Sequence, residues 1–575
     1  MTKRVGLTGI FLAVAGLVSV QAAELPKTIA YYGTPSAYFD EHADDVAQLY
    51  DGFFFNVGSW DEGVVANLGL SRESSPTTDW KEKIGRNLAH LRSAGVTENL
   101  LSVSFSDSAP WPSPETLLSA EYTAKMAKHF GSLGRNAREL GFRGVSIDVE
   151  YPYPRYSLDH AVYTYDGYTA EDLLAAAGGQ GRAVMDAVLD AFPDAVIFEL
   201  PGYLLGRPIE RAFTIGMLDV MAERDAPGGF HLGTERAYCL LDPVSQVAIS
   251  REGDLTACAL LTGKTLDYWK RRCTVAPGVW PLHMVETGGK GYPVRPWREE
   301  LAELRQQMEI LRGVAKRYMW SFSGQPVWYP YSEDLVRQYG LPKQEFNGAA
   351  EAVAGWHEIL RDKKVTEDTR ILKLVRDVKA FDRGKIGPAE LCSRFGTPGD
   401  WLVLSPLGNP FTQPAFAASR LPLGPIRFDA PVNGRDGLVR WHTFHNYEPL
   451  GSVRLMAAAG WRRTDDCSAL LASNVSSARD VKAFLWLNWD DGVVVRLNGQ
   501  TVFDHPDYPE RGHGLLYNDR YNFEDHVPVE IPKGESLLLV TSINLHGSWG
   551  VNLRIADQDG FPLDGVSFSL PRHVD

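Results

Sequence analysis

The stretch GVSIDVEYP, residues 144–152, is a short apolar run that ends in two carboxylates followed by an aromatic residue. Alternate side chains of an extended chain point the same way, so Ser146, Asp148 and Glu150 share one face. Two carboxylates this close repel each other as anions, and one of them tends to hold a proton near neutral pH. The stretch therefore predicts a strand that delivers an acid–base pair at its carboxyl end.

Similar apolar stretches lie on both sides of this one, and helical patterns separate them. We expect strands at TIAYYG (28–33), GFFFNVG (52–58), LLSVSF (100–105), GVSIDVE (144–150), AVIFELPGY (195–203), GFHLGTE (229–235), GVWPLHMVE (278–286) and RYMWSFSG (317–324). The helical patterns include residues 79–94, 121–140, 181–192, 209–223 and 296–315. Strands that alternate with helices over about 300 residues predict an α/β fold of the (β/α)8 or TIM-barrel type. A doubly wound open sheet is the alternative, but no glycine-rich phosphate loop follows any strand.

The composition changes after the predicted barrel, which we place at residues 24–345. Residues 346–398 are charged and helical and predict a connector packed on the barrel. From 399 to 575 the chain consists of short β-rich runs separated by Gly, Pro, Asn and Asp, which indicates an all-β sandwich. Within 483–503, an Asp-Asp-Gly and an Asn-Gly segment predict hairpin turns.

Residues 1–23 have the features of a secretory signal peptide: two basic residues, an apolar run and a small-residue cleavage site. A membrane anchor is the alternative, but the run is short for a span and no later segment reaches that length. We therefore expect a secreted or periplasmic protein with no membrane association after cleavage. An oxidising compartment would allow one local disulfide. Its candidate cysteines are Cys239, Cys258 and Cys273.

The overall composition is that of a globular protein, with 44% apolar and 23% charged residues. The net charge of −14 is spread along the chain without a basic run, which excludes nucleic acid and anionic membranes as expected partners. The 15 Trp and 23 Tyr residues provide flat faces that suit sugar rings. The cysteines lack zinc spacing and histidines do not cluster, so we expect neither a metal nor another cofactor.

In a (β/α)8 barrel the active site lies where the strands end. The ionisable residues expected there are Asp107, Asp148, Glu150, Glu199, Glu235, His283 and Glu286. The aromatic residues expected at the same rim are Trp60, Trp111, Tyr151, Tyr153, Tyr203, Tyr238, Trp320 and Trp328. Acids and aromatics with few cations favour a poly- or oligosaccharide, because carboxylates transfer protons and aromatic rings stack on sugars.

From this rim we select two sets of candidates. The candidate catalytic residues are Glu150, Asp148, Glu235 and Glu286. The candidate substrate-binding residues are Trp320, Tyr151, Tyr203, Glu199, Tyr238, His283 and Trp60. Each carboxylate also has a structural alternative: Asp148 or Glu150 bonded to backbone amides or Arg143, Glu199 capping a turn, and Glu235 paired with Arg236 or Arg211.

The stretch GVSIDVEYP resembles the fourth-strand signature of chitinase-like (family 18) glycoside hydrolases, a DxxDxDxE pattern often followed by Tyr-Pro. The resemblance implies that Glu150 protonates the glycosidic oxygen and that Asp148 orients the substrate's acetamido group. Trp320 in MWSFSG resembles the eighth-strand Trp that floors the sugar site. The chain departs from the pattern where Arg143 and Ser146 replace the earlier aspartates, and where FHLGTERAY replaces Met-x-Tyr-Asp.

Retaining barrel glycosidases offer a second template, with an acid/base after strand four and a nucleophile after strand seven. Glu150 and Glu286 would take these positions, although Val149 stands where that clan has Asn. Glu235 is a third candidate partner for Glu150. The separation of the two carboxyls would decide the stereochemistry, at about 5–5.5 Å for retention and about 6.5–9.5 Å for inversion.

The C-terminal region resembles the galactose-binding-like accessory sandwiches of secreted polysaccharide-degrading enzymes, through WLVLSPLGNP (401–410), DDGVVVRLNG (490–499) and SWGVNLRI (548–555). Its Trp486, Trp489 and Trp549 could stack on sugars or belong to the sandwich core. The whole chain therefore reads as a secreted glycoside hydrolase of unassigned oligomeric state. A non-catalytic glycan-binding protein on a decayed barrel is the rival, whereas an esterase or deacetylase lacks both a GxSxG elbow and a histidine-rich metal set.

Overall fold

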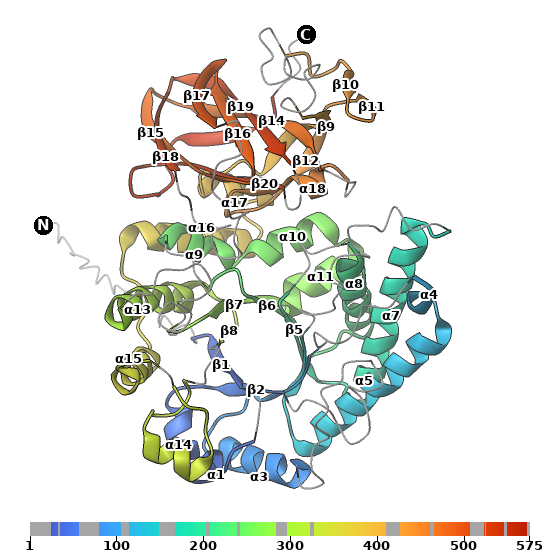
Figure 1. Cartoon of the computed structure of the whole chain (residues 1–575), viewed down its shortest axis with the longest axis vertical. Coiled ribbons are helices and arrows are strands. Elements are labelled where there is room, and N and C mark those ends of the chain that lie inside the picture. The colour runs from blue at the N-terminus through green and yellow to red at the C-terminus, as the bar shows by residue number, and fades with distance from the viewer. Residues whose placement is uncertain are drawn as a thin grey trace, which may run out of the picture.

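The apolar stretches form parallel strands that pair in chain order and close into an eight-stranded barrel, because β1 pairs with both β2 and β8 (Figure 1). The strands are β1 Lys27–Tyr32, β2 Gly52–Asn56, β3 Leu100–Ser104, β4 Gly144–Asp148, β5 Val196–Leu200, β6 Phe230–Thr234, β7 Thr274–Val279 and β8 Tyr318–Ser321. The structure is a computed structural model, and it describes residues 25–32, 35–56, 80–104, 114–148, 167–202, 208–238, 242–282, 296–322, 327–344, 346–409, 426–460, 465–505, 523, 525–545 and 549–571. The predicted (β/α)8 barrel is confirmed.

Each barrel strand is buried on both faces because it alternates between the barrel interior and the surrounding helices. Ile29, Phe54 and Phe198 belong to the interior cluster, whereas their neighbours Phe53 and Ile197 pack in the outer core. The surrounding helices are α1 Ala37–Ala47, α3 Trp80–Ser93, α4 Pro114–Leu117, α5 Ala120–Leu140, α7 Ala170–Ala191, α8 Pro208–Arg224, α9 Pro243–Ile249, α10 Glu252–Leu260, α11 Gly263–Arg272 and α13 Trp297–Val314. Side-chain caps mark several starts, as where Ser119 accepts from the Tyr122 amide at 3.2 Å.

The seventh strand begins earlier than predicted. It spans Thr274–Val279, whereas we expected a strand over 278–286. The predicted start at Gly278 therefore lies inside β7. A Cβ at Gly278 would lie 2.8 Å from both Trp320 and Tyr238, so this glycine allows close packing in the barrel and does not form a turn. The helices α9, α10 and α11 occupy the chain between β6 and β7, which we had not predicted as helical.

Four helices follow the barrel: α14 Glu333–Tyr339, α15 Ala349–Asp362, α16 Thr369–Asp382 and α17 Pro388–Arg394. Apolar residues of the last three, including Trp356, Leu374 and Leu391, belong to the same buried cluster as the outer face of the barrel. The indole of Trp356 also donates to Tyr50 Oη at 3.0 Å. The connector therefore packs on the barrel and shares its core.

The C-terminal part is a pair of antiparallel sheets whose inner faces form one core, as expected for a sandwich (Figure 1). One sheet has the order β12-β9-β14-β19-β16-β17 with β21 beside β14, and the other has the order β13-β20-β15-β18. A small β10-β11 sheet and helix α18 complete this part. The elements are β9 Asp400–Gly408, β10 Val432–Gly434, β11 Gly437–Val439, β12 His442–His445, β13 Ser452–Arg454, α18 Leu455–Ala458, β14 Cys467–Ser477, β15 Val481–Trp489, β16 Gly492–Leu497, β17 Gln500–His505, β18 Asp525–Ile531, β19 Gly534–Asn544, β20 Gly550–Ala556 and β21 Val566–Ser569.

The two predicted turns of the sandwich have different outcomes. Asn498 and Gly499, with φ of 50° and 79°, join β16 and β17 in the predicted hairpin. The Asp-Asp-Gly segment does not form a hairpin, because β15 and β16 belong to different sheets. Asp491 carries the chain across from one sheet to the other with φ of 57°. The Asp-Asp-Gly segment therefore connects two sheets and does not join neighbouring strands of one sheet.

Burial settles the position of the tryptophans in the sandwich. Trp489 and Trp549 lie in its core, and Trp486 is 8% exposed and donates from its indole to the Asp557 carbonyl at 3.1 Å. None of the three presents an open face for stacking on a sugar. The expected local disulfide is wrong for Cys258 and Cys273, which are both free thiols, and Cys239 lies outside the described residues. Within the described ranges, the helices are all too short or too polar to cross a membrane.

Candidate functional site

Asp148 occupies the last position of β4, and its side chain faces the interior of the barrel. Its neighbour Ile147 belongs to the outer core, so the strand alternation turns Asp148 inward. Asp148 is 5% exposed, and its Oδ2 accepts a hydrogen bond from Tyr31 Oη at 3.2 Å. Tyr31 comes from β1, on the other side of the barrel mouth. A buried carboxylate requires such donors, and the closed barrel supplies one from a distant strand.

An aromatic cluster fills the interior beside this carboxylate. The ring of Tyr31 lies 6.3 Å from Trp320 and 5.5 Å from Phe322, between centroids. Tyr238, which follows β6, lies 5.5 Å from Trp320 and 6.0 Å from Phe322. Trp280 packs against Tyr238 at 5.4 Å. We call these five residues the aromatic floor.

Glu235 is attached to the same floor from the side of β6. Tyr238 Oη donates to Glu235 Oε1 at 3.4 Å, and the Tyr238 amide donates to the Glu235 carbonyl at 3.0 Å, which closes a turn. Glu235 is partly exposed. Each of the carboxylates Asp148 and Glu235 is thus hydrogen-bonded to a tyrosine, and both tyrosines contact Trp320. Trp320 and Tyr238 are buried, whereas Tyr31, Trp280 and Phe322 are partly exposed. Two carboxylates around such an aromatic surface can transfer protons to and from a sugar that stacks on its partly exposed rings.

Small and polar residues shape the interior below the floor. Gly233 leaves room for Leu200, because a Cβ there would lie 2.2 Å from the leucine side chain. The buried hydroxyls of Ser102 and Ser146 and the indole N–H of Trp320 have no hydrogen-bond partner among the described residues. The Ser146 hydroxyl lies on the same face of β4 as Asp148. The β3–β4 side of the interior is therefore polar.

His231 lies deeper in the interior, near the start of β6. Burial, together with the positive charge of Arg317, lowers its pKa to about 3, so its ring is neutral at physiological pH. Its Nδ1 lies 2.8 Å from Thr274 Oγ1, and its Nε2 lies 3.3 Å from the Gly228 carbonyl. Its ring stacks edge-on against Tyr318 at 4.8 Å. These contacts identify His231 as a packed interior residue at the end of the barrel opposite Asp148.

Glu199 was expected at the rim, but the structure places it elsewhere. It lies on the outer face of β5, is fully buried, and accepts a hydrogen bond from Thr214 Oγ1 of α8 at 2.8 Å. Trp328 is also away from the rim, stacked on Phe39 at 4.5 Å in the outer core. The strand periodicity explains Glu199, because it is one residue out of phase with the inward-facing Phe198 and Leu200.

The structure brings together Asp148, Glu235, Tyr238 and Trp320 from the predicted set. Glu150, Tyr151, Tyr203, His283, Glu286 and Trp60 lie outside the described residues, as do Asp107, Trp111 and Tyr153. Because β7 ends at Val279, His283 and Glu286 lie well beyond the strand end at which we expected them. The described part of the chain contains no group of three or more His, Cys, Asp or Glu residues arranged to hold a metal ion.

Sequence reasoning missed three members of the floor: Tyr31, Trp280 and Phe322. A signal was present for Tyr31 and Phe322, whereas Trp280 lies near the start of the strand predicted over 278–286. Tyr31 is two residues after the interior Ile29, and Phe322 is two residues after Trp320. Counting in steps of two from one interior residue per strand would have identified both.

The chain was compared with protein families, with curated proteins and with solved structures. No family model matches this chain, and no curated protein matches it. Among solved structures, a GH18 chitinase from Pseudoalteromonas aurantia matches 52% of this chain and 93% of its own, at 16% identity and a TM-score of 0.29. A GH10 xylanase from Thermobacillus composti matches 58% and 96%, at 14% identity and a TM-score of 0.29. Old Yellow Enzyme from Pichia matches 56% and 85%, at 12% identity and a TM-score of 0.30.

The class of this protein rests on its own strand order, a closed parallel barrel joined to an antiparallel sandwich. Barrels of this class carry many unrelated activities, so a function has to be argued from the residues at the carboxyl ends of the strands.

Proposed function

We propose that this chain is a secreted glycoside hydrolase that cleaves a poly- or oligosaccharide at the carboxyl-terminal face of its barrel. The observation that carries the proposal is Asp148, a buried carboxylate at the end of β4 that receives a hydrogen bond from Tyr31 beside the aromatic floor. Hydrolysis of a sugar chain requires carboxyl groups beside the bound sugar, and aromatic rings supply a surface on which the sugar can stack.

Glu150 follows Asp148 by two residues and is proposed as the general acid that protonates the leaving glycosidic oxygen. Asp148 would influence the protonation of Glu150 and hold a polar group of the substrate. This division of roles is what the likeness of GVSIDVEYP to the fourth-strand signature of chitinase-like enzymes implies. The acetamido group of an N-acetylated sugar is one group that Asp148 could orient.

Glu235 is proposed as the second carboxylate, which stabilises positive charge on the sugar ring at the transition state or attacks it. Its support is the hydrogen bond from Tyr238, which connects it to the floor. Glu286 is the alternative partner, and it lies beyond the end of β7.

The test is the variant Glu150→Gln, which keeps the size of the side chain and removes the proton donor. We expect release of reducing ends from a panel of oligo- and polysaccharides to fall by at least about a hundredfold, since a positioned acid contributes about 10²–10⁴-fold. The matched control is Glu139→Gln, which removes an exposed carboxylate on α5. That variant should hydrolyse the same substrates at the rate of the parent protein.

Near-parental hydrolysis by Glu150→Gln would refute the assignment. The rival, a glycan-binding protein without activity, is favoured by Ser146 and Arg143 at positions where the resemblance would place aspartates. Saturable glycan binding by the parent chain, with no reducing-end release from any substrate, would establish that rival.

We also propose that residues 1–23 direct export and are then removed, and that the mature chain comprises a barrel domain (24–345), a helical connector (346–398) and an accessory sandwich (399–575). The support is the basic, apolar and small-residue order of the first segment. The sandwich tryptophans Trp486, Trp489 and Trp549 are buried, which supports a structural role for this domain more than a glycan-binding one.

A further inference from the structure

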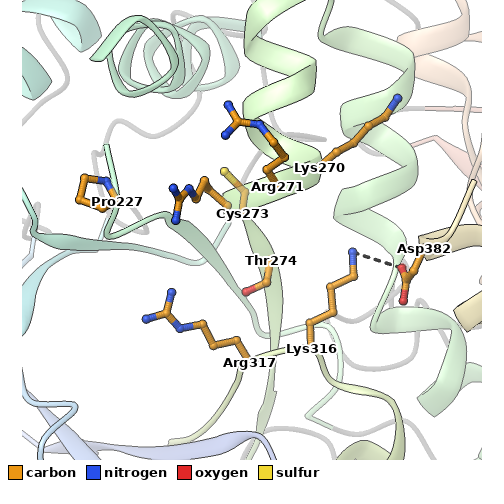
Figure 2. Close-up of a pocket in the computed structure, with 9 residues that line it drawn as sticks. Pro227, Lys270, Arg271, Cys273, Thr274, Lys316, Arg317 and Asp382 are labelled. Atoms are coloured by element: carbon orange, nitrogen blue, oxygen red, sulfur yellow. Dashed lines mark ion pairs between the residues drawn. The ribbon is translucent and has the colours of Figure 1, made fainter. Parts of the chain in front are cut away.

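A cavity of about 360 Å³ opens at the amino-terminal face of the barrel, opposite the candidate active site. It lies where β7 and β8 begin, between Thr274 and Arg317, and the end of α11 forms its other wall (Figure 2). The described residues that line it are Pro227, Lys270, Arg271, Arg272, Cys273, Thr274, Lys316, Arg317 and Asp382. Its volume lies within the usual range of small-molecule sites, about 300–1,000 Å³.

The lining is strongly basic although the chain as a whole is acidic. Five of the lining residues are Lys or Arg and one is Asp, in a protein with a net charge of −14. The single carboxylate is already neutralised. Asp382 receives two hydrogen bonds from Arg251, at 2.9 and 2.8 Å, and lies 3.2 Å from Lys316 (Figure 2). Lys316 also pairs with Asp254 at 2.8 Å.

Three cations remain without a carboxylate partner among the described residues: Lys270, Arg272 and Arg317. Arg271 differs from them, because it pairs with Asp225 at 3.0 Å. Arg317 donates to the Gly228 carbonyl at 3.2 Å and lies over the Tyr318 ring at 4.9 Å, which leaves other N–H groups of its guanidinium available. Lys270 and Arg272 are exposed.

The negative carboxyl ends of two helices offset only part of this positive charge. Helices α11 and α13 end at Arg272 and Val314, and each contributes about half a negative charge at its carboxyl end. Together they offset about one of the three unpaired cations. The excess comes from two separate segments, the last turn of α11 and the start of β8, which converge on one cavity.

We propose that this cavity binds a phosphate or sulfate group, as the free ion or as an ester on a sugar, between Arg272 and Arg317. Lys270 points away from Arg317 and takes no part in the site (Figure 2). Two guanidinium groups match a tetrahedral group that carries about two negative charges and several acceptor oxygens, because each guanidinium can donate two parallel hydrogen bonds. The site does not depend on the proposed hydrolase activity, since it lies at the other face of the barrel.

The test is calorimetric titration of the full-length chain with inorganic phosphate, and separately with inorganic sulfate, at constant ionic strength maintained with chloride. We expect saturable binding of one ion per chain. In Arg272→Gln the dissociation constant should rise about tenfold, as for loss of a hydrogen bond to a charged group. Arg272 is exposed, so the variant should melt at the temperature of the parent protein.

Arg479→Gln provides the matched control, because it removes an exposed cation from the turn between β14 and β15 of the sandwich. Its dissociation constant should equal that of the parent. Titration with a sugar 6-phosphate and a sugar 6-sulfate then separates a free ion from an ester, and tighter binding of either form supports the site. The absence of saturable binding, or equal weakening in Arg479→Gln and Arg272→Gln, would overturn the proposal.

Discussion

Tyr31 connects the first strand of the barrel to the fourth through a hydrogen bond. Its hydroxyl donates to Asp148 at 3.2 Å, and its ring contacts Trp320 and Phe322 of the aromatic floor. A carboxylate that is 5% exposed has little access to water, so hydrogen bonds from the protein replace its solvation. Tyr31 is therefore a positioning residue for Asp148 under the proposed function.

Replacing Tyr31 by Phe removes only the donor and keeps the ring in the floor. We expect kcat to fall about ten- to a hundredfold, because a hydrogen bond to a charged group contributes about 1.5–3 kcal/mol. KM should change little, since the stacking surface is preserved. Tyr122→Phe on α5, whose hydroxyl has no hydrogen bond among the described residues, is the control and should retain the parental kcat. A change in KM alone would contradict this role for Tyr31.

At the scale of elements, β7 depends on the absence of a side chain at Gly278. A Cβ at this position would lie 2.8 Å from Trp320, 2.8 Å from Tyr238 and 2.9 Å from the Thr234 carbonyl. All three belong to neighbouring strands or to the floor, so they cannot move independently. The glycine thereby allows β6, β7 and β8 to approach each other below the candidate site.

Gly278→Ala should overpack this region and lower the free energy of unfolding by about 1–3 kcal/mol. Urea denaturation monitored by tryptophan fluorescence measures the change, and Trp320 lies at the point of contact. Gly313→Ala is the matched control, because no atom lies within 4 Å of a Cβ there and the residue is inside α13. That variant should be neutral or stabilised by up to about 1 kcal/mol. Equal denaturation midpoints for the two variants would show that β7 tolerates the methyl group.

At the scale of the whole molecule, buried ion pairs join the sandwich to the barrel. Arg554 of β20 is fully buried and donates to Asp242 at 2.7 Å and to Ser245 at 2.7 Å, at the start of α9. Arg236, next to Glu235, pairs with Glu252 of α10 and with Glu448 of the C-terminal part at 2.9 Å. The sandwich therefore supports the segment after β6 that carries a candidate catalytic carboxylate.

Arg554→Ala should destabilise the whole chain by about 3 kcal/mol, at the lower end of the range for breaking a buried pair, because the Asp242 carboxylate, which is 15% exposed, would lose its charge partner. Thermal unfolding of the full-length protein is the measurement, with a lower melting temperature as the expected result. Lys373→Ala removes an exposed ion pair with Asp564 at the same interface and should cost about 0–1 kcal/mol. Similar losses in both variants would mean that the buried pair contributes no more than a surface contact.

The sequence by itself determined the features that local signals specify. The alternation of strands and helices identified the barrel, and the Asn-Gly pair identified the β16–β17 hairpin, because its positive φ angles suit these residues. The end of β4 placed Asp148 at the barrel mouth, and the stretch MWSFSG placed Trp320 in the last strand. Each of these depends on neighbours within a few residues.

Only the tertiary structure decided which face of each strand points inward. Strands of a closed parallel barrel are covered on both sides, so both faces are apolar and the hydrophobic pattern cannot distinguish them. Glu199 therefore lies against α8, although its sequence context resembled that of Asp148. The contact of Tyr31 with Asp148 and the anchoring of the sandwich through Arg554 join residues far apart in the chain. They exist only because the barrel closes and the two domains dock.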